Sequence, residues 1–180
     1  MASGAIGAIS ASVFAGQIHF FKLKVNLATW TMVLILDFVG LALLLAAGNK
    51  EPFIQIGWCL AAILIFFAAL KNRGDWKWSR TESWSVGACA LAVAIWIATG
   101  SVWSLLGYLL AAFISVIPQV AQYWTEKREE RIKATWLWVV SAFAILLAII
   151  GSPKTPEYMI VLLGLLVLNA GMTWLTLRKE

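Results

Sequence analysis

Long apolar runs separated by short polar segments constrain this sequence most. They lie at 3–21, 28–48, 52–70, 84–100, 102–124, 134–151 and 156–177. Most approach the roughly 20 residues that a helix needs to cross about 30 Å of hydrocarbon. Because the interior of a bilayer offers no water to backbone groups, helices are the spans that such runs predict. The sequence therefore predicts an all-α integral membrane protein with seven transmembrane helices.

The composition favours the same class of protein. Of the 180 residues, 62% are hydrophobic and 13% are charged, whereas a soluble domain carries about 25% charged residues. The net charge of +5 could indicate nucleic acid, but the cations flank apolar runs and are interpreted as topology and headgroup anchors. Cys59 and Cys89 lie inside apolar runs without a CxxC pair. We therefore expect a lipid bilayer as partner, no nucleic acid, and no metal or cofactor.

The positions of Lys and Arg predict the orientation. With the N-terminus outside, all 14 cations except Lys50 and Lys154 fall in inner loops or in the C-terminal tail. The positive-inside rule expects this division for seven spans, and six spans would disrupt it. We expect a protein of the plasma (inner) membrane with its N-terminus outside and its C-terminus in the cytoplasm.

Most of the 11 tryptophans lie near the predicted inner ends, where amphipathic rings prefer the headgroup level. Most of these eight are interpreted as an aromatic belt: Trp30, Trp76, Trp78, Trp84, Trp124, Trp136, Trp138 and Trp174. The other three lie in the outer half and are freer to face a cavity: Trp58, Trp96 and Trp103.

A Pro-Gln pair, Pro118 and Gln119, interrupts the run at 102–124. A proline inside a helix removes a backbone donor and clashes with the preceding turn, at a cost of roughly 3 kcal/mol. Membrane helices tolerate such a break where neighbouring helices pair the freed carbonyl, often beside a cavity. From these residues alone, the pair is either a hinge or a structural kink.

The Pro-Gln stretch has a second copy near the N-terminus. Residues 14–22 (FAGQIHFFK) align with 116–124 (VIPQVAQYW), so that Gly16–Gln17 corresponds to the Pro-Gln pair. Cations and an Ala-Thr-Trp tripeptide follow each copy, at 28–30 and 134–136, before two further apolar runs. The sequence therefore contains an internal repeat of three apolar runs.

This repeat predicts the organisation of the chain. Residues 1–73 form a first three-helix repeat, 74–101 form an inner loop and a linker helix, and 102–180 form a second repeat. Three spans reverse the direction of the chain, so one additional span restores a parallel orientation. We expect two parallel three-helix bundles joined by the linker helix, a 3+1+3 arrangement.

At this level the chain resembles the PQ-loop and SWEET-like transporter superfamily. The resemblance rests on the 3+1+3 plan, on the two Pro-Gln copies, and on Asn169 followed by Gly171. It implies a carrier of a small polar solute, such as a sugar or an amino acid, that works by alternating access. The gate or hinge would comprise Pro118, Gln119, Gly16 and Gln17. Because the chain holds both halves, a monomer suffices and an oligomer is not required.

Asp37 is the one acid well inside a predicted span. A carboxylate at the bilayer centre costs about 2.5–3.5 kcal/mol, so such residues usually face an interior cavity and mark an ion or proton pathway. We predict that Asp37 contacts the substrate and could couple transport to protons. The alternative is a neutral residue that fixes helix packing.

Asn169, Thr173 and Trp58 complete the predicted substrate-binding set. Asn169 and Thr173 share one face of the last span, and Asn169 aligns roughly with Ala62 of the first copy. An amide suits a polyol or an amino-acid headgroup, although a membrane Asn can also simply join helices. Weaker candidates that could be structural are Gln55, Gln122 and Tyr108.

The sequence also bears on other classes of function. A non-transporting receptor or partner protein could use the same scaffold. An enzyme is not expected, because the sequence shows no metal cluster, no nucleophile–base pair and no paired carboxylates. A retinal protein needs a lysine inside its last helix, and the 156–177 run contains none.

Overall fold

The computed structural model describes residues 12, 15–16, 18–19, 25–46, 53–72, 78–99, 101–151 and 156–179. The regular elements in these ranges are all helical, which confirms the predicted all-α class. Two apolar helical stretches lie at Leu27–Ala42 and Gln55–Lys71. The described residues also contain four helices long and apolar enough to cross a membrane: Arg80–Thr99, Leu106–Thr125, Arg128–Ile150 and Met159–Leu177.

The helices follow the predicted apolar runs closely. Those that match one run each are α2 (Leu27–Ala46), α3 (Phe53–Lys71), α4 (Arg80–Thr99), α8 (Thr135–Gly151) and α9 (Pro156–Leu177). The fifth run instead forms two helices, α5 (Ser101–Ser115) and α6 (Ile117–Thr125). A short helix α7 (Arg128–Arg131) and a 3₁₀ turn η1 (Ile132–Ala134) lead into α8. Most of the first predicted run, 3–21, lies outside the described residues.

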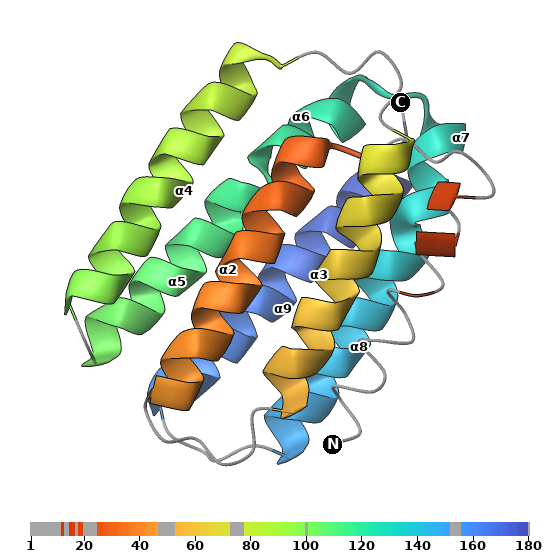
Figure 1. Cartoon of the computed structure of the whole chain (residues 1–180). Coiled ribbons are helices and arrows are strands. Elements are labelled where there is room, and N and C mark those ends of the chain that lie inside the picture. Colours follow the sequence, from red (N-terminus) through yellow and green to blue (C-terminus); the bar gives the residue numbers. More distant parts are fainter. Residues whose placement is uncertain are drawn as a thin grey trace.

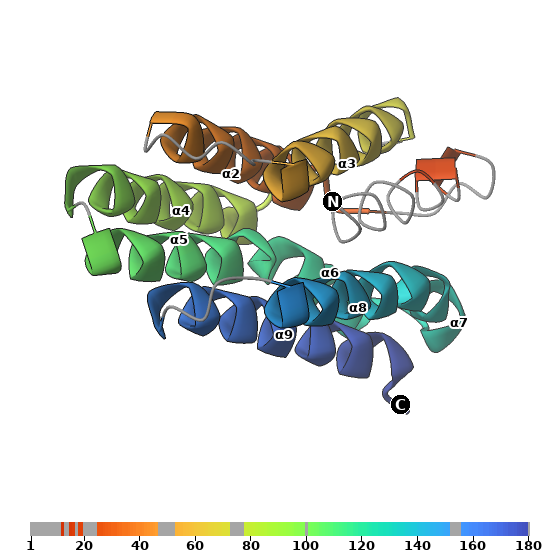
Figure 2. The same ribbon diagram turned by 90° about the horizontal axis from the view of Figure 1, so that it is seen from below.

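The long helices lie side by side (Figure 1). One end of the bundle carries Lys71 and Arg178 as well as the segment 126–134, and we call it the basic end. α2 and α8 run away from the basic end, whereas α3 and α9 run towards it. α4 packs against α5 and α2, and α5 contacts both α2 and α9. Figure 2 shows α2 and α3 on one side of α5, with α8 and α9 on the opposite side.

The Pro-Gln pair lies at the break between α5 and α6. Val116 adopts φ −90° and ψ −6° there, and Pro118 lies in the first turn of α6, where its missing N–H is tolerated. The N–H of Gln119 donates to Thr29 Oγ1 on α2 at 3.1 Å. The Val120 N–H then donates to the Val116 carbonyl at 2.9 Å as the helix resumes. The chain is therefore kinked at this pair, and the kink is bonded to α2.

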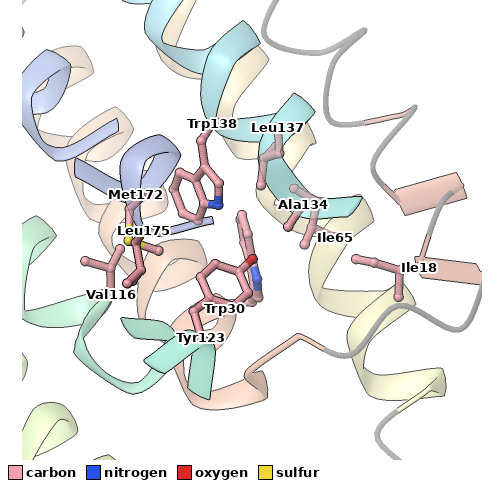
Figure 3. Packing of buried hydrophobic residues seen from close by; sticks show 10 residues of the cluster. All are labelled: Ile18, Trp30, Ile65, Val116, Tyr123, Ala134, Leu137, Trp138, Met172 and Leu175. Carbon is pink, nitrogen blue, oxygen red and sulfur yellow. The ribbon is translucent and has the colours of Figure 1, made fainter. Parts of the chain in front are cut away.

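Two tryptophans near the basic end belong to the core. Trp30 and Trp138 are 7% and 6% exposed, and their rings stack with centroids 6.5 Å apart. They lie in a cluster that joins α2, α3, α6, α8 and α9 (Figure 3). These two tryptophans do not belong to the predicted aromatic belt, because their side chains pack against neighbouring helices. The exposed tryptophans at this end agree with a belt: Trp78, Trp84, Trp124, Trp136 and Trp174.

Gly164 marks a close approach of α9 to α5. A Cβ at this position would lie 2.6 Å from both Cδ atoms of Leu109. We expect Gly164→Ala to lower the free energy of unfolding by about 1–3 kcal/mol, because Leu109 must move out of a packed interface. Thermal denaturation of the purified protein in detergent measures this loss.

Gly171→Ala on the same helix is the matched control. A Cβ at Gly171 meets no atom within 4 Å in the described residues. Both substitutions gain the same helix propensity, so the difference between their melting temperatures reports the Leu109 contact. Equal melting temperatures would contradict a tight contact at Gly164.

Candidate functional site

A cavity of about 150 Å³ lies among α2, α3, α5, α8 and α9. Its wall is mainly apolar, and α4 contributes none of the described lining residues. A mostly apolar pocket with a few polar groups is the usual form of a small-molecule site. A cavity of about this volume can hold a molecule of the size of benzene. The polar side chains at the wall, apart from the tryptophans, are Asp37, Tyr108, Ser115, Ser141 and Asn169.

Asp37 reaches the cavity from the middle of α2 and is 6% exposed. The side-chain amide of Gln55 on α3 donates to the Asp37 carbonyl at 3.1 Å and to its Oδ1 at 3.4 Å. The salt bridge found in the described part of the chain is Lys133–Glu130, so Asp37 has no cationic partner there. Gln55 therefore positions a carboxylate that lines the cavity and has no salt-bridge partner among the described residues.

Asn169 and Trp58 line the same cavity from α9 and α3. The Asn169 side-chain nitrogen donates one hydrogen to the Leu165 carbonyl at 2.8 Å, so its second N–H and the amide oxygen are left for a ligand. The structure thus brings Asp37, Trp58 and Asn169 together. Thr173 is not among the lining residues, and its hydroxyl donates to the Asn169 carbonyl at 2.8 Å.

Sequence reasoning missed part of the wall. On α5, Ala112 and Ser115 line the cavity together with Tyr108, which was predicted only as a weaker candidate. Their spacings of four and three residues place all three on one face of the helix. Trp138 and Ser141 line it from α8 with the same kind of spacing. This periodicity of small and polar positions within an apolar run is the signal that could have found them.

A second set of polar side chains lies between the cavity and the basic end. We call Asn26, Thr29, Glu82 and Gln119 the Gln119 cluster, and each is at most 7% exposed. Gln119 Oε1 accepts from the Asn26 N–H at 2.9 Å, in addition to the bond from its own N–H to Thr29. The Asn26 side-chain nitrogen donates to Glu82 Oε1 at 2.9 Å. The Gln119 cluster therefore ties α6 to the start of α2 and to the start of α4.

Helix capping explains why two members of the cluster lie there. Asn26 Oδ1 accepts from the Thr29 N–H at 3.1 Å, which caps α2. Ser79 and Glu82 form a reciprocal capping box at α4, in which the Glu82 N–H donates to Ser79 Oγ at 3.3 Å and the Ser79 N–H donates to Glu82 Oε2. A carboxylate at a helix N-terminus is also favoured by the helix dipole. The S-x-x-E pattern could have revealed this cap in the sequence.

The predicted gate residues are placed as follows. Pro118 and Gln119 are buried next to Val116, which lines the cavity. Gly16 is half-buried, and a Cβ there would meet no atom within 4 Å in the described residues. Gln17 lies outside the described residues.

The helices and their apolar faces indicate a helical, membrane-embedded protein with a cavity among its helices. The chain matches no protein-family model, no curated protein and no solved structure. Among the described residues, no three His, Cys, Asp or Glu side chains are grouped as a metal site would need.

Proposed function

We propose that this protein is a membrane transporter that moves a small polar solute by alternating access. The observation that carries the proposal is a cavity lined by helices of both predicted repeats, α2 and α3 from the first and α5, α8 and α9 from the second. In carriers built from parallel repeats, the substrate lies near the bilayer midplane at the repeat interface. Asp37, Trp58 and Asn169 would contact the solute.

The course of the helices supports two parallel three-helix bundles with α4 as the linker. α2 and α8 run in one direction, and α3 and α9 run in the other (Figure 1). The Ala-Thr-Trp tripeptides lie at equivalent places, because Ala28 and Ala134 are both buried where α2 and α8 begin. Ala62 and Asn169, which align in the two copies, both line the cavity. In this proposal the basic end faces the cytoplasm.

The Gln119 cluster would close the cavity towards the basic end. Thr29 precedes the cavity residue Trp30, and Gln119 follows the cavity residue Val116 by one turn. Opening this side requires the bonds from α6 to α2 and from α2 to α4 to break. Each such bond contributes about 1 kcal/mol net, because water replaces the lost partner. The closed state is thus stabilised by only a few kcal/mol, which a change of ligand can offset.

Uptake into vesicles tests the transporter. A thermal-shift screen of the purified protein against sugars, amino acids and amines identifies a ligand, since a bound ligand raises stability by mass action. We expect that ligand to be taken up, in radiolabelled form, by liposomes that contain the protein. Saturable binding without flux would contradict the transporter and favour a receptor on the same scaffold.

The hinge has its own test in the same assay. We expect Pro118→Ala to slow uptake several-fold, because Pro118 maintains the break between α5 and α6 beside the cavity. Gly16→Ala is the matched change at the equivalent position and should slow uptake less, since the added Cβ meets open space in the described residues. Small, equal effects of both variants would mean that the Pro-Gln pair is a structural kink and not a hinge.

A further inference from the structure

The polar groups at the cavity wall include donors as well as acceptors, and Asp37 is the charged group among the described residues of the wall. The Asn169 side-chain nitrogen donates one hydrogen to the Leu165 carbonyl, which leaves its second N–H and the amide oxygen. The Ser115 hydroxyl donates to the Ala112 carbonyl at 2.8 Å, which leaves its lone pairs. Asp37 adds carboxylate oxygens. The carboxylate is therefore the group that favours a cation over an uncharged sugar, because a sugar brings no counter-charge.

Aromatic rings form much of the remaining wall. Trp30, Trp58, Trp138 and Tyr108 all line the cavity, and the stacked pair Trp30 and Trp138 is visible in Figure 3. The face of an aromatic ring carries negative potential and attracts an organic cation, most strongly where water is excluded. The aromatic residues and the carboxylate therefore both favour a positively charged ligand.

Asp37 also needs a positive partner if it is to stay charged. It is 6% exposed and has no cationic side chain within salt-bridge distance in the described residues. A buried carboxylate without a partner is costly, so it binds either a proton or a cation. Since one carboxylate satisfies only one of them at a time, a cationic ligand and a proton would compete.

We propose that the cavity binds a small organic monocation, an alkylammonium of about six to eight non-hydrogen atoms, with Asp37 as its counter-charge. The size follows from a cavity of about 150 Å³, which suits a ligand near the size of benzene. The proposal rests on the proposed transporter for the movement of this ligand, but its binding rests on the cavity alone. Entry of the cation would displace the proton, so that transport exchanges one for the other.

Other titratable groups near Asp37 are neutral in ordinary conditions. Cys59 on α3 interacts electrostatically with Asp37, and Tyr108 reaches the wall from α5. On α4, Cys89 packs against Leu36, the residue next to Asp37. None of these is an acid that would titrate with Asp37 below neutral pH, so competition by protons on acidification reports Asp37.

Choline and its uncharged carbon isostere, 3,3-dimethylbutan-1-ol, test the proposal. Isothermal titration of the full-length protein in detergent should show choline binding at least tenfold tighter than the isostere. The affinity for choline should fall as the pH is lowered, by at most about tenfold per pH unit for one competing proton. Asp37→Asn should abolish the preference for choline, while Glu130→Gln, which alters an exposed acid, should keep it.

A second variant keeps the proposal testable if Asp37→Asn does not fold. Trp58→Leu should weaken choline about threefold to thirtyfold, the range of a cation–π contact, and should affect the isostere less. If the isostere or glucose binds more tightly than choline, the proposal of a cationic ligand is wrong, whereas the proposed transport function is not contradicted. Choline binding without choline flux in liposomes would keep the class and contradict the transporter.

Discussion

Asp37→Asn is expected to abolish the dependence of solute uptake on a pH gradient. The carboxyl of Asp37 lies at the cavity wall and is held by Gln55. An amide cannot bind and release a proton, so the variant loses the group that would couple the two movements. Uptake into liposomes, measured with an acidic, an alkaline and no gradient, should differ about tenfold or more in the wild type and become equal in the variant.

The same variant separates a coupling role from a packing role. An Asn at position 37 can still accept the hydrogen bond from Gln55 and carries no buried charge. The melting temperature of the variant should therefore equal or exceed that of the wild type. Glu130→Gln is the control, because Glu130 is a solvent-exposed acid in a pair with Lys133. If uptake in the Asp37 variant matches the wild type at every gradient, the proton role is wrong. A large fall in melting temperature would instead indicate a packing residue.

Arg131→Met is expected to cause a large loss of stability. Arg131 is 1% exposed, and its guanidinium donates to the Tyr123 carbonyl at 3.2 Å and to the Arg178 carbonyl at 3.1 Å. These carbonyls lie at the C-terminal ends of α6 and α9, where helix carbonyls lack partners and a cation is favoured by the helix dipole. Losing two charge-assisted bonds should lower the free energy of unfolding by about 2–4 kcal/mol.

Lys133→Ala, two residues away, provides the comparison. Lys133 forms a salt bridge of 2.8 Å with Glu130, but both side chains are nearly half exposed. Such surface pairs contribute about 0–1 kcal/mol. Thermal and denaturant unfolding in detergent should therefore rank Arg131→Met far below Lys133→Ala. Equal stability of the two variants would mean that the cost of burying the guanidinium cancels the bonds it makes.

The positions of the helices were largely predictable. The run predicted at 156–177 is α9, and the run at 134–151 begins one residue before α8. The length of an apolar run relative to the thickness of a bilayer is a local property, so a single sequence reveals it. The placement of Asp37 and Asn169 at one cavity was predictable for a related reason, because an isolated polar residue in an apolar span needs an interior position.

The break in the fifth run was predictable, but the partners of the break were not. The missing N–H of Pro118 is a property of the residue type. That Gln119 bonds Asn26 and Thr29 depends on how α6 meets α2. Glu82 carried no predicted role, since only the meeting of α4 and α2 brings its carboxylate to Asn26.

The tryptophans show which properties the sequence determines and which depend on the tertiary structure. By itself, the sequence determined an all-helical membrane protein and the placement of tryptophans near one end, because hydropathy and run length are read along the chain. Only the tertiary structure decided that Trp138 faces the cavity whereas Trp136 is 53% exposed. Side chains two positions apart on a helix, such as these, point about 200° apart around its axis. A helix that is apolar on all sides does not specify which side chain meets the neighbouring helices. Packing against α2 and α9 makes that choice.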